Sequence, residues 1–138
     1  MPKNKTSTKR SILGLVDYNT PIRYELKNPA NGTGLGVFFD LVSIESDVAV
    51  SVFREHLLQP DISQKIAGNE RLTIGMQVAR ERIAAAIVGW DFNGNVLEDG
   101  DEDEPALTLE NKMKLLSKDW IQKQLDAQVS KISNFMKR

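Results

Sequence analysis

Two stretches of alternating hydrophobic and polar residues constrain the fold more than any other feature of the sequence. In residues 21–27, Ile22, Tyr24 and Leu26 alternate with charged residues, and residues 35–44 (LGVFFDLVSI) are rich in β-branched and aromatic side chains. The segment between them, NPANGTG, is dense in turn-forming residues. This pattern predicts a β-hairpin. Because an isolated hairpin is only marginally stable in water, it must pack against other elements.

The middle of the chain predicts two helices. Ser46 or Asp47 is positioned to cap the first helix. Its apolar positions, at steps of three and four, are Val48, Val52, Phe53, His56 and Leu57. After a polar connector at 59–69, a second helix is expected to begin near Asn69 or Glu70 and to keep its helical periodicity as far as Trp90. Its apolar positions are Leu72, Met76, Ala79, Ile83, Ala86, Ile87 and Trp90.

The C-terminal third predicts two more helices. Thr108 is an N-cap candidate for the first, LENKMKLLS, which presents Leu109, Met113 and Leu116. The second follows within residues 119–138. The chain is therefore expected to be an α+β domain over residues 12–138, mostly helical, in which an N-terminal β-hairpin packs on about four α-helices. Residues 1–11 are expected to form a flexible basic arm.

Amino-acid composition indicates the cellular compartment and limits the kinds of partner to expect. The 138 residues include no cysteine, which fits a reducing compartment and excludes thiol chemistry. No apolar run approaches the roughly 18 residues that a membrane helix needs, and no signal peptide is evident. We therefore expect a cytoplasmic protein without a membrane partner. The basic arm carries Lys3, Lys5, Lys9 and Arg10; it is interpreted as a solvated terminus, so no specific nucleic-acid binding is expected.

A dense acidic segment suggests a calcium site at first sight. Seven carboxylates lie between Asp91 and Glu104, most of them in residues 98–104. An EF-hand loop needs glycine at its sixth position, but the register from Asp91 places Val96 there, and the register from Asp99 places Glu104 there. The segment is therefore interpreted as a solvated acidic turn before a helix start, with weak calcium binding as the alternative. No metal site is predicted.

The sequence gives no support for catalysis. Its only histidine, His56, is expected to be a packed or surface residue of the first helix. The chain contains no nucleophile-elbow, Walker, zinc-protease or dinucleotide-binding motif. The glycines at 32, 34 and 36 join strand to strand and lack the helix N-terminus that would hold a phosphate. Neither catalytic residues nor a cofactor are predicted, and the protein is not expected to be an enzyme.

The last predicted helix keeps an apolar stripe almost to residue 138. Because chain ends usually fray and become polar, such a stripe must pack on something. It either packs on its own domain or binds a partner as a helix in a groove. In the second interpretation the partner-binding residues are Ile121, Leu125, Val129, Ile132, Phe135 and Met136.

The order of these features resembles a known family. NPANGTGLG followed by a strand and SDV, then IAAAIVGWDFNGNVL, then TLENKMKLLSKDWIQKQL, are similar to segments of the small tail assembly chaperones of lambda-like, long-tailed bacteriophages. The resemblance covers residues 22–135 in outline. In this family's motifs, Gly89 and Trp90, the turn at Asn93 and Gly94, and Trp120 match structural positions that place the acidic segment and the last helix.

The resemblance implies a non-enzymatic assembly factor in the cytoplasm of the infected host. Such proteins coat the long, helical tape measure protein, help to recruit tail tube subunits, and are absent from the mature virion. A frameshifted, longer form contacts the tube protein in many of these phages, and self-association is also expected. The alternative is a minor structural protein of the tail that is incorporated in the virion.

Overall fold

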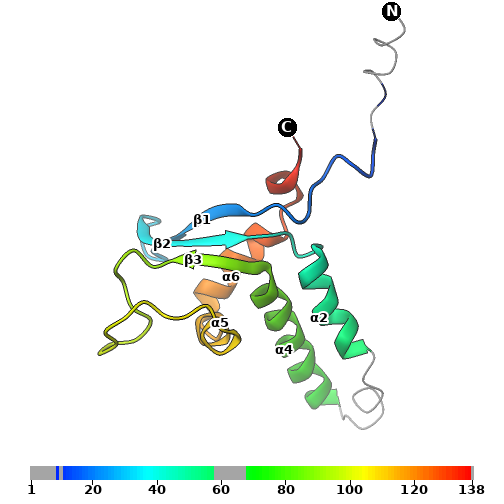
Figure 1. Cartoon of the computed structure of the whole chain (residues 1–138). Helices are drawn as coiled ribbons and strands as arrows, with labels where there is room; N and C mark the ends of the chain where they lie inside the picture. The colour runs from blue at the N-terminus through cyan, green and yellow to red at the C-terminus, as the bar shows by residue number, and fades with distance from the viewer. Residues whose placement is uncertain (1–8, 10, 58–67, 138) are drawn as a thin grey trace, which may run out of the picture.

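The predicted β-hairpin is present, and it belongs to a three-stranded antiparallel sheet in the order β1-β2-β3 (Figure 1). The computed structural model describes residue 9 and residues 11–57 and 68–137. Strand β1 spans Ile22–Lys27 and strand β2 spans Gly34–Leu41. They pair with Tyr24 opposite Phe39. The α+β class predicted from the sequence is confirmed.

Strand β3, Ile87–Asp91, corrects the prediction of one helix running from Asn69 to Trp90. The helix in that region, α4, spans Gly68–Ala86 and ends where the β-branched pair Ile87 and Val88 begins. Such residues favour strands over helices. The backbone of β3 pairs with the free edge of β2, with Trp90 opposite Phe39. The sheet therefore gains a strand that helical periodicity concealed.

Helix α2 spans Asp47–Leu57. Of the two predicted caps, Ser46 is the one that acts, because its Oγ accepts the backbone N–H of Ala49 at 3.4 Å. The prediction that Val48 lies on the buried face of this helix is wrong, because Val48 is exposed and Ala49 is buried instead. The side chains of Phe53, His56 and Leu57 lie outside the described part, as do residues 1–8, 10 and 58–67, which contain most of the predicted arm and connector.

Helix α5 spans Leu109–Leu116, and helix α6 spans Asp119–Val129. The predicted cap of α5 is confirmed: Thr108 Oγ1 accepts the N–H of Asn111 at 3.2 Å. The predicted apolar register of α5 is only partly right, because Leu109 is exposed while Leu115 and Leu116 are buried. A short 3₁₀ helix, η1, spans Ile132–Phe135.

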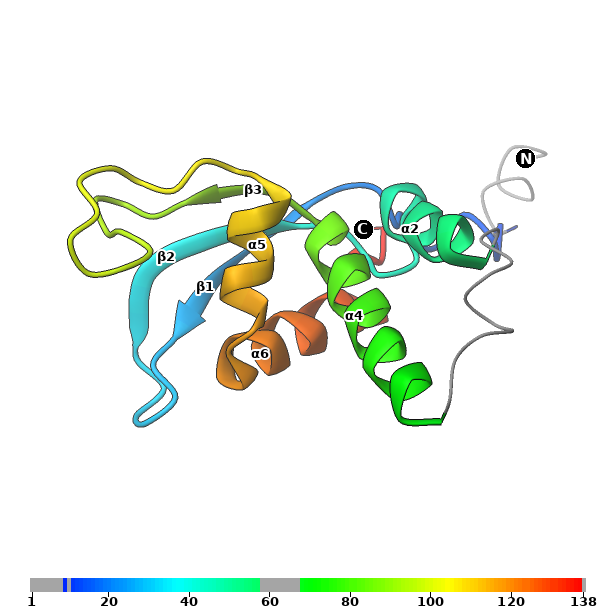
Figure 2. The same cartoon turned by 90° about the horizontal axis from the view of Figure 1, so that it is seen from below.

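The core lies between one face of the sheet and the helices. Helices α4, α5 and α6 lie on this face, and α2 lies beside α4 (Figures 1 and 2). The sheet contributes Leu26, Val37, Phe39 and Leu41 to the core. The helices contribute Ile83, Leu116, Leu125 and Val129, among others. The opposite face of the sheet carries Arg23, whose guanidinium lies 3.7 Å from Asp40 and from Asp91.

Candidate partner-binding surface

A groove of about 310 Å³ runs between α4 and α6. Ile44, Val78 and Ile83 give it an apolar lining. Gly75 and Ala79 also line it; they stand four residues apart on α4 and therefore share one face of that helix. A Cβ placed on Gly75 would meet nothing within 4 Å, so this part of the groove opens to solvent. Small residues at this spacing allow another chain to approach the α4 backbone closely.

Polar side chains border the same groove and are held in place. Arg80 Nε donates to Gln122 Oε1 at 3.0 Å and so joins α4 to α6. Arg82 Nε donates to the carbonyl oxygen of Ile44 at 3.0 Å. Asp126, on the α6 side, accepts a hydrogen bond from Ser130 Oγ at 3.2 Å. An apolar groove with an ordered polar border has the character of a protein interface.

A second depression, of about 240 Å³, lies among α2, α4 and α5. It is more charged than the α4–α6 groove, since Glu55, Glu81 and Lys112 all contribute to its lining. Partial burial lowers the pKa of the Lys112 ammonium. An apolar partner would have to desolvate these three charges, whereas two charged residues, Arg82 and Asp126, line the α4–α6 groove. The α4–α6 groove is therefore the better candidate for binding a helix.

The predicted partner-binding stripe does not form one exposed helical face. Helix α6 ends at Val129, and the chain continues into η1. Ile121, Leu125, Val129 and Phe135 are buried in the chain's own core, whereas Ile132 and Met136 are 44% and 42% exposed. The stripe therefore packs mainly on its own domain, and only its last part offers apolar surface.

The Gly89–Trp90 pair and the turn after it hold the acidic segment. Trp90 packs edge-to-face on Phe92, with ring centroids 5.2 Å apart, and its Nε1 donates to the carbonyl oxygen of Pro105 at 2.9 Å. Asn93 and Gly94 have φ values of 52° and 86°, the left-handed conformation that asparagine and glycine adopt most readily. Trp120, at the start of α6, is exposed.

Carboxylates of the acidic segment itself hold the segment in place by accepting backbone hydrogen bonds. The Glu104 carboxylate accepts the backbone N–H of Phe92, and the N–H of Glu98 donates to Asp101 Oδ2 at 3.0 Å. Within residues 9, 11–57 and 68–137, no three His, Asp or Glu side chains are grouped so that they could hold a metal ion. The segment is an exposed turn closed by hydrogen bonds.

The Trp90 anchor yields a testable expectation. Trp90→Phe should lower the free energy of unfolding by about 1 kcal/mol, because the Pro105 carbonyl loses its donor. Amide hydrogen exchange in residues 98–106 should become faster. Urea denaturation and exchange measured by mass spectrometry would check both expectations. Trp120→Phe is the control, and equal losses in the two variants would contradict the anchoring role.

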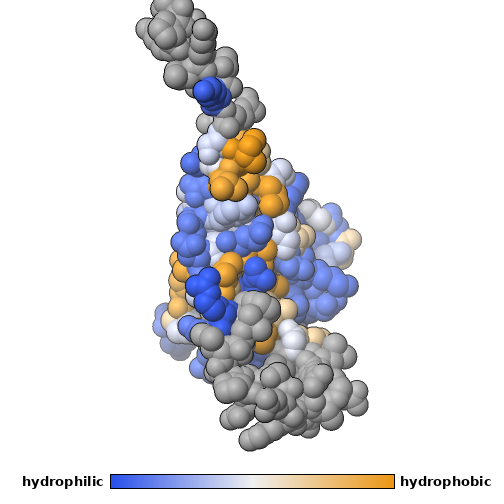
Figure 3. Space-filling view, turned by 90° about the vertical axis from the view of Figure 1, so that its right-hand side faces the viewer, coloured by the Kyte–Doolittle hydropathy of each residue, from blue (hydrophilic) through white to orange (hydrophobic). Residues whose placement is uncertain are grey.

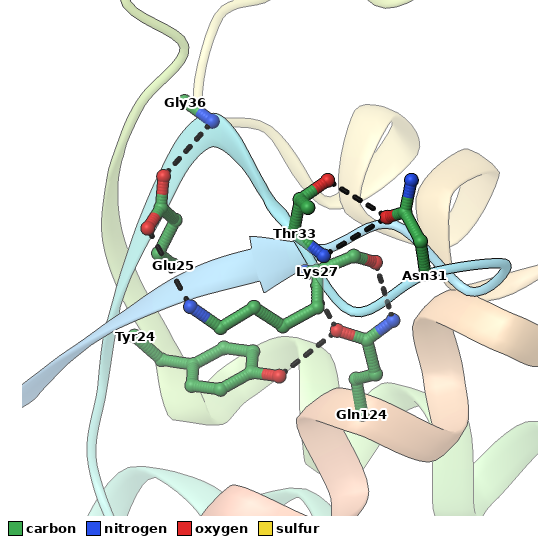
Figure 4. Close-up of polar contacts among 7 residues, drawn as sticks. All are labelled: Tyr24, Glu25, Lys27, Asn31, Thr33, Gly36 and Gln124. Carbon is green, nitrogen blue, oxygen red and sulfur yellow. Dashed lines mark hydrogen bonds and ion pairs between the residues drawn. The ribbon is translucent and has the colours of Figure 1, made fainter.

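Gln124 is a positioning residue that sequence reasoning did not single out. Its amide donates to the carbonyl oxygen of Lys27 and accepts the Lys27 N–H, both at 2.9 Å, and its Oε1 also accepts from the Tyr24 hydroxyl at 2.9 Å (Figure 4). These contacts join α6 to the end of β1. Burial raises the pKa of the Tyr24 phenol. A glutamine on the polar side of a helix carries no sequence signal for this role.

Glu25 is a second positioning residue, and it holds the glycine-rich end of the hairpin. Its Oε2 accepts the N–H of Gly36 at 3.1 Å, and its Oε1 lies 3.5 Å from Lys27 Nζ (Figure 4). The carboxyl group occupies the space where a side chain on Gly34 would be, and Gly36 has a φ of 77°. These glycines shape the hairpin.

Comparisons with known proteins do not identify the chain. No protein-family model, no curated protein and no solved structure matches it. Among the helices of the described residues, none has the length and apolar character needed to cross a membrane.

Proposed function

We propose that the protein is a non-enzymatic phage tail assembly chaperone that binds the tape measure protein through the α4–α6 groove. It further helps to recruit tail tube subunits, self-associates, acts in the host cytoplasm and is absent from the mature virion. A longer, frameshifted form would make the contact with the tube protein.

The α4–α6 groove is the observation that carries this proposal. A long helical partner presents ridges of apolar side chains, and such ridges fit a groove lined by Gly75, Ala79 and Ile83. Arg80, Gln122 and Asp126 at the border are placed to meet the polar flanks of the partner helix. The sequence resemblance over residues 22–135 gives independent support for the identity of that partner.

The proposal is tested by a tagged pull-down from phage-producing cells, together with mass spectrometry of purified virions. Tape measure protein in the pull-down and absence of the chain from virions are the expected results. Stoichiometric presence in virions would instead assign the chain to the structural proteins of the tail.

A variant that fills the groove tests the proposed binding site. Ala79→Trp should reduce the amount of co-purified tape measure protein by about tenfold or more, because the indole occupies the space of the partner's side chains. Ala79 is exposed, so the fold should persist, and thermal unfolding followed by circular dichroism checks this. The control is Ala106→Trp, at an exposed alanine outside the groove. Undiminished binding by Ala79→Trp would exclude this groove.

A further inference from the structure

A tight turn at Ser11–Gly14 presents two large aliphatic side chains to solvent. Ile12 is 72% exposed and Leu13 is 93% exposed. They occupy the two central positions of the turn, where glycine, proline, asparagine and aspartate are usual. In Figure 3, hydrophobic surface lies toward the upper end of the described part of the molecule. The turn therefore displays apolar groups where turn chemistry favours polar ones.

Hydrogen bonds hold this turn in one conformation. The N–H of Gly14 lies 3.2 Å from both the carbonyl oxygen and the Oγ of Ser11. The N–H of Leu15 donates to the carbonyl oxygen of Ile12 at 3.3 Å. A backbone that is ordered before binding loses less conformational entropy when its side chains enter a pocket. Ile12 and Leu13 thus project from a preorganised turn.

The base of the turn is fixed to the core through the C-terminal segment. Lys137 N–H donates to the carbonyl oxygen of Leu15, and Asp17 N–H donates to that of Phe135, each at 2.8 Å. Phe135 is buried, so these bonds connect the turn to the packed interior. Met136, which bridges to Val16, adds exposed apolar surface at the same end of the molecule.

Positively charged residues adjoin the displayed apolar groups. Lys9 precedes the turn, and Lys137 donates its backbone N–H to the Leu15 carbonyl at the base of the turn; both residues are exposed. Asp17, at the base of the turn, accepts from the Thr20 hydroxyl at 2.5 Å; this bond is the main reason that the pKa of Asp17 is lowered, and the Lys137 ammonium adds to the same shift. Cations around exposed aliphatic groups are complementary to an apolar pocket with an acidic border.

We infer that the Ser11–Gly14 turn is a second docking element, which inserts Ile12 and Leu13 into an apolar pocket bordered by carboxylates on a protein partner. The element stands at a different place from the α4–α6 groove and does not depend on the function proposed for that groove. The exposed aliphatic side chains would supply most of the affinity, and the charges of Lys9 and Lys137 would supply orientation and association rate.

Photo-crosslinking tests the inference directly. A benzophenone amino acid replaces Leu13 in the full chain, in the cells where the chain is naturally made, and the adduct is mapped by mass spectrometry. The expected adduct is with another protein, at an apolar site that has Asp or Glu around it, and it should weaken about tenfold when Lys9→Glu and Lys137→Glu are combined. The same probe at Leu107, an exposed leucine of the acidic end, is the control.

Four outcomes would overturn the inference: no adduct, an adduct with lipid or nucleic acid, an adduct with another copy of the chain, or equal crosslinking in the charge-reversed variant. Vesicles of phosphatidylglycerol and phosphatidylcholine test the membrane separately, and no binding is expected. The combined variant Ile12→Ser and Leu13→Ser should lose the partner found by crosslinking but still bind through the groove. Ala79→Trp should keep the Leu13 adduct, so the two sites can fail independently.

Discussion

Phe39→Ala should lower the free energy of unfolding by about 3–5 kcal/mol, the range usual for removal of a buried aromatic side chain. Phe39 is fully buried. Its ring lies edge-to-face on Trp90 and Phe92, with centroids 6.2 and 6.3 Å apart. Removing it would leave a cavity where β2, β3 and the start of the acidic segment meet. Urea denaturation monitored by circular dichroism would measure the loss.

The neighbouring residue Phe38 provides the matched control. Its side chain points to the other face of the sheet and is only partly buried, with the Arg23 guanidinium 5.2 Å from its ring centroid. Phe38→Ala should therefore cost about 1 kcal/mol, the scale of a partly exposed cation–π contact with some lost burial. Similar losses for the two variants would show that the sheet does not bury the face assigned here.

Leu125→Ala should lower the free energy of unfolding of the protein alone by about 2–5 kcal/mol. Leu125 is fully buried on α6, in the core beneath the sheet. The result separates the two interpretations of the C-terminal stripe, because a residue reserved for a partner would contribute little to the stability of the free chain. Thermal or urea unfolding of the purified protein is the appropriate measurement.

Ile132→Ala is the control for this second expectation. Ile132 belongs to the same predicted stripe but is exposed, so its truncation should change stability by about 0.5 kcal/mol or less. If Leu125→Ala unfolded at the same urea concentration as the unaltered protein, the burial of α6 would be wrong. The stripe would then be available for partner binding.

Local sequence signals predicted the hairpin and several element boundaries well. Alternation identified β1 and β2, Ser46 and Thr108 were found as caps, and Asn93 and Gly94 were found as a turn. Each of these features depends on contacts within a few residues. The α4–α6 groove was not predicted, because its lining comes from segments separated by more than thirty residues in sequence.

The sequence by itself determined the α+β class, since period-two alternation and helical periodicity are properties of neighbouring residues. Only the tertiary structure decided that Ile87–Asp91 is a strand and that most of the C-terminal apolar stripe is buried in the chain's own core. Apolar residues at helical spacing before Trp90 are compatible with either structure, and the free edge of β2 selected a strand. Likewise, an apolar stripe shows that a face must be covered, but only the positions of β1, α4 and α5 show that the chain covers Leu125 itself.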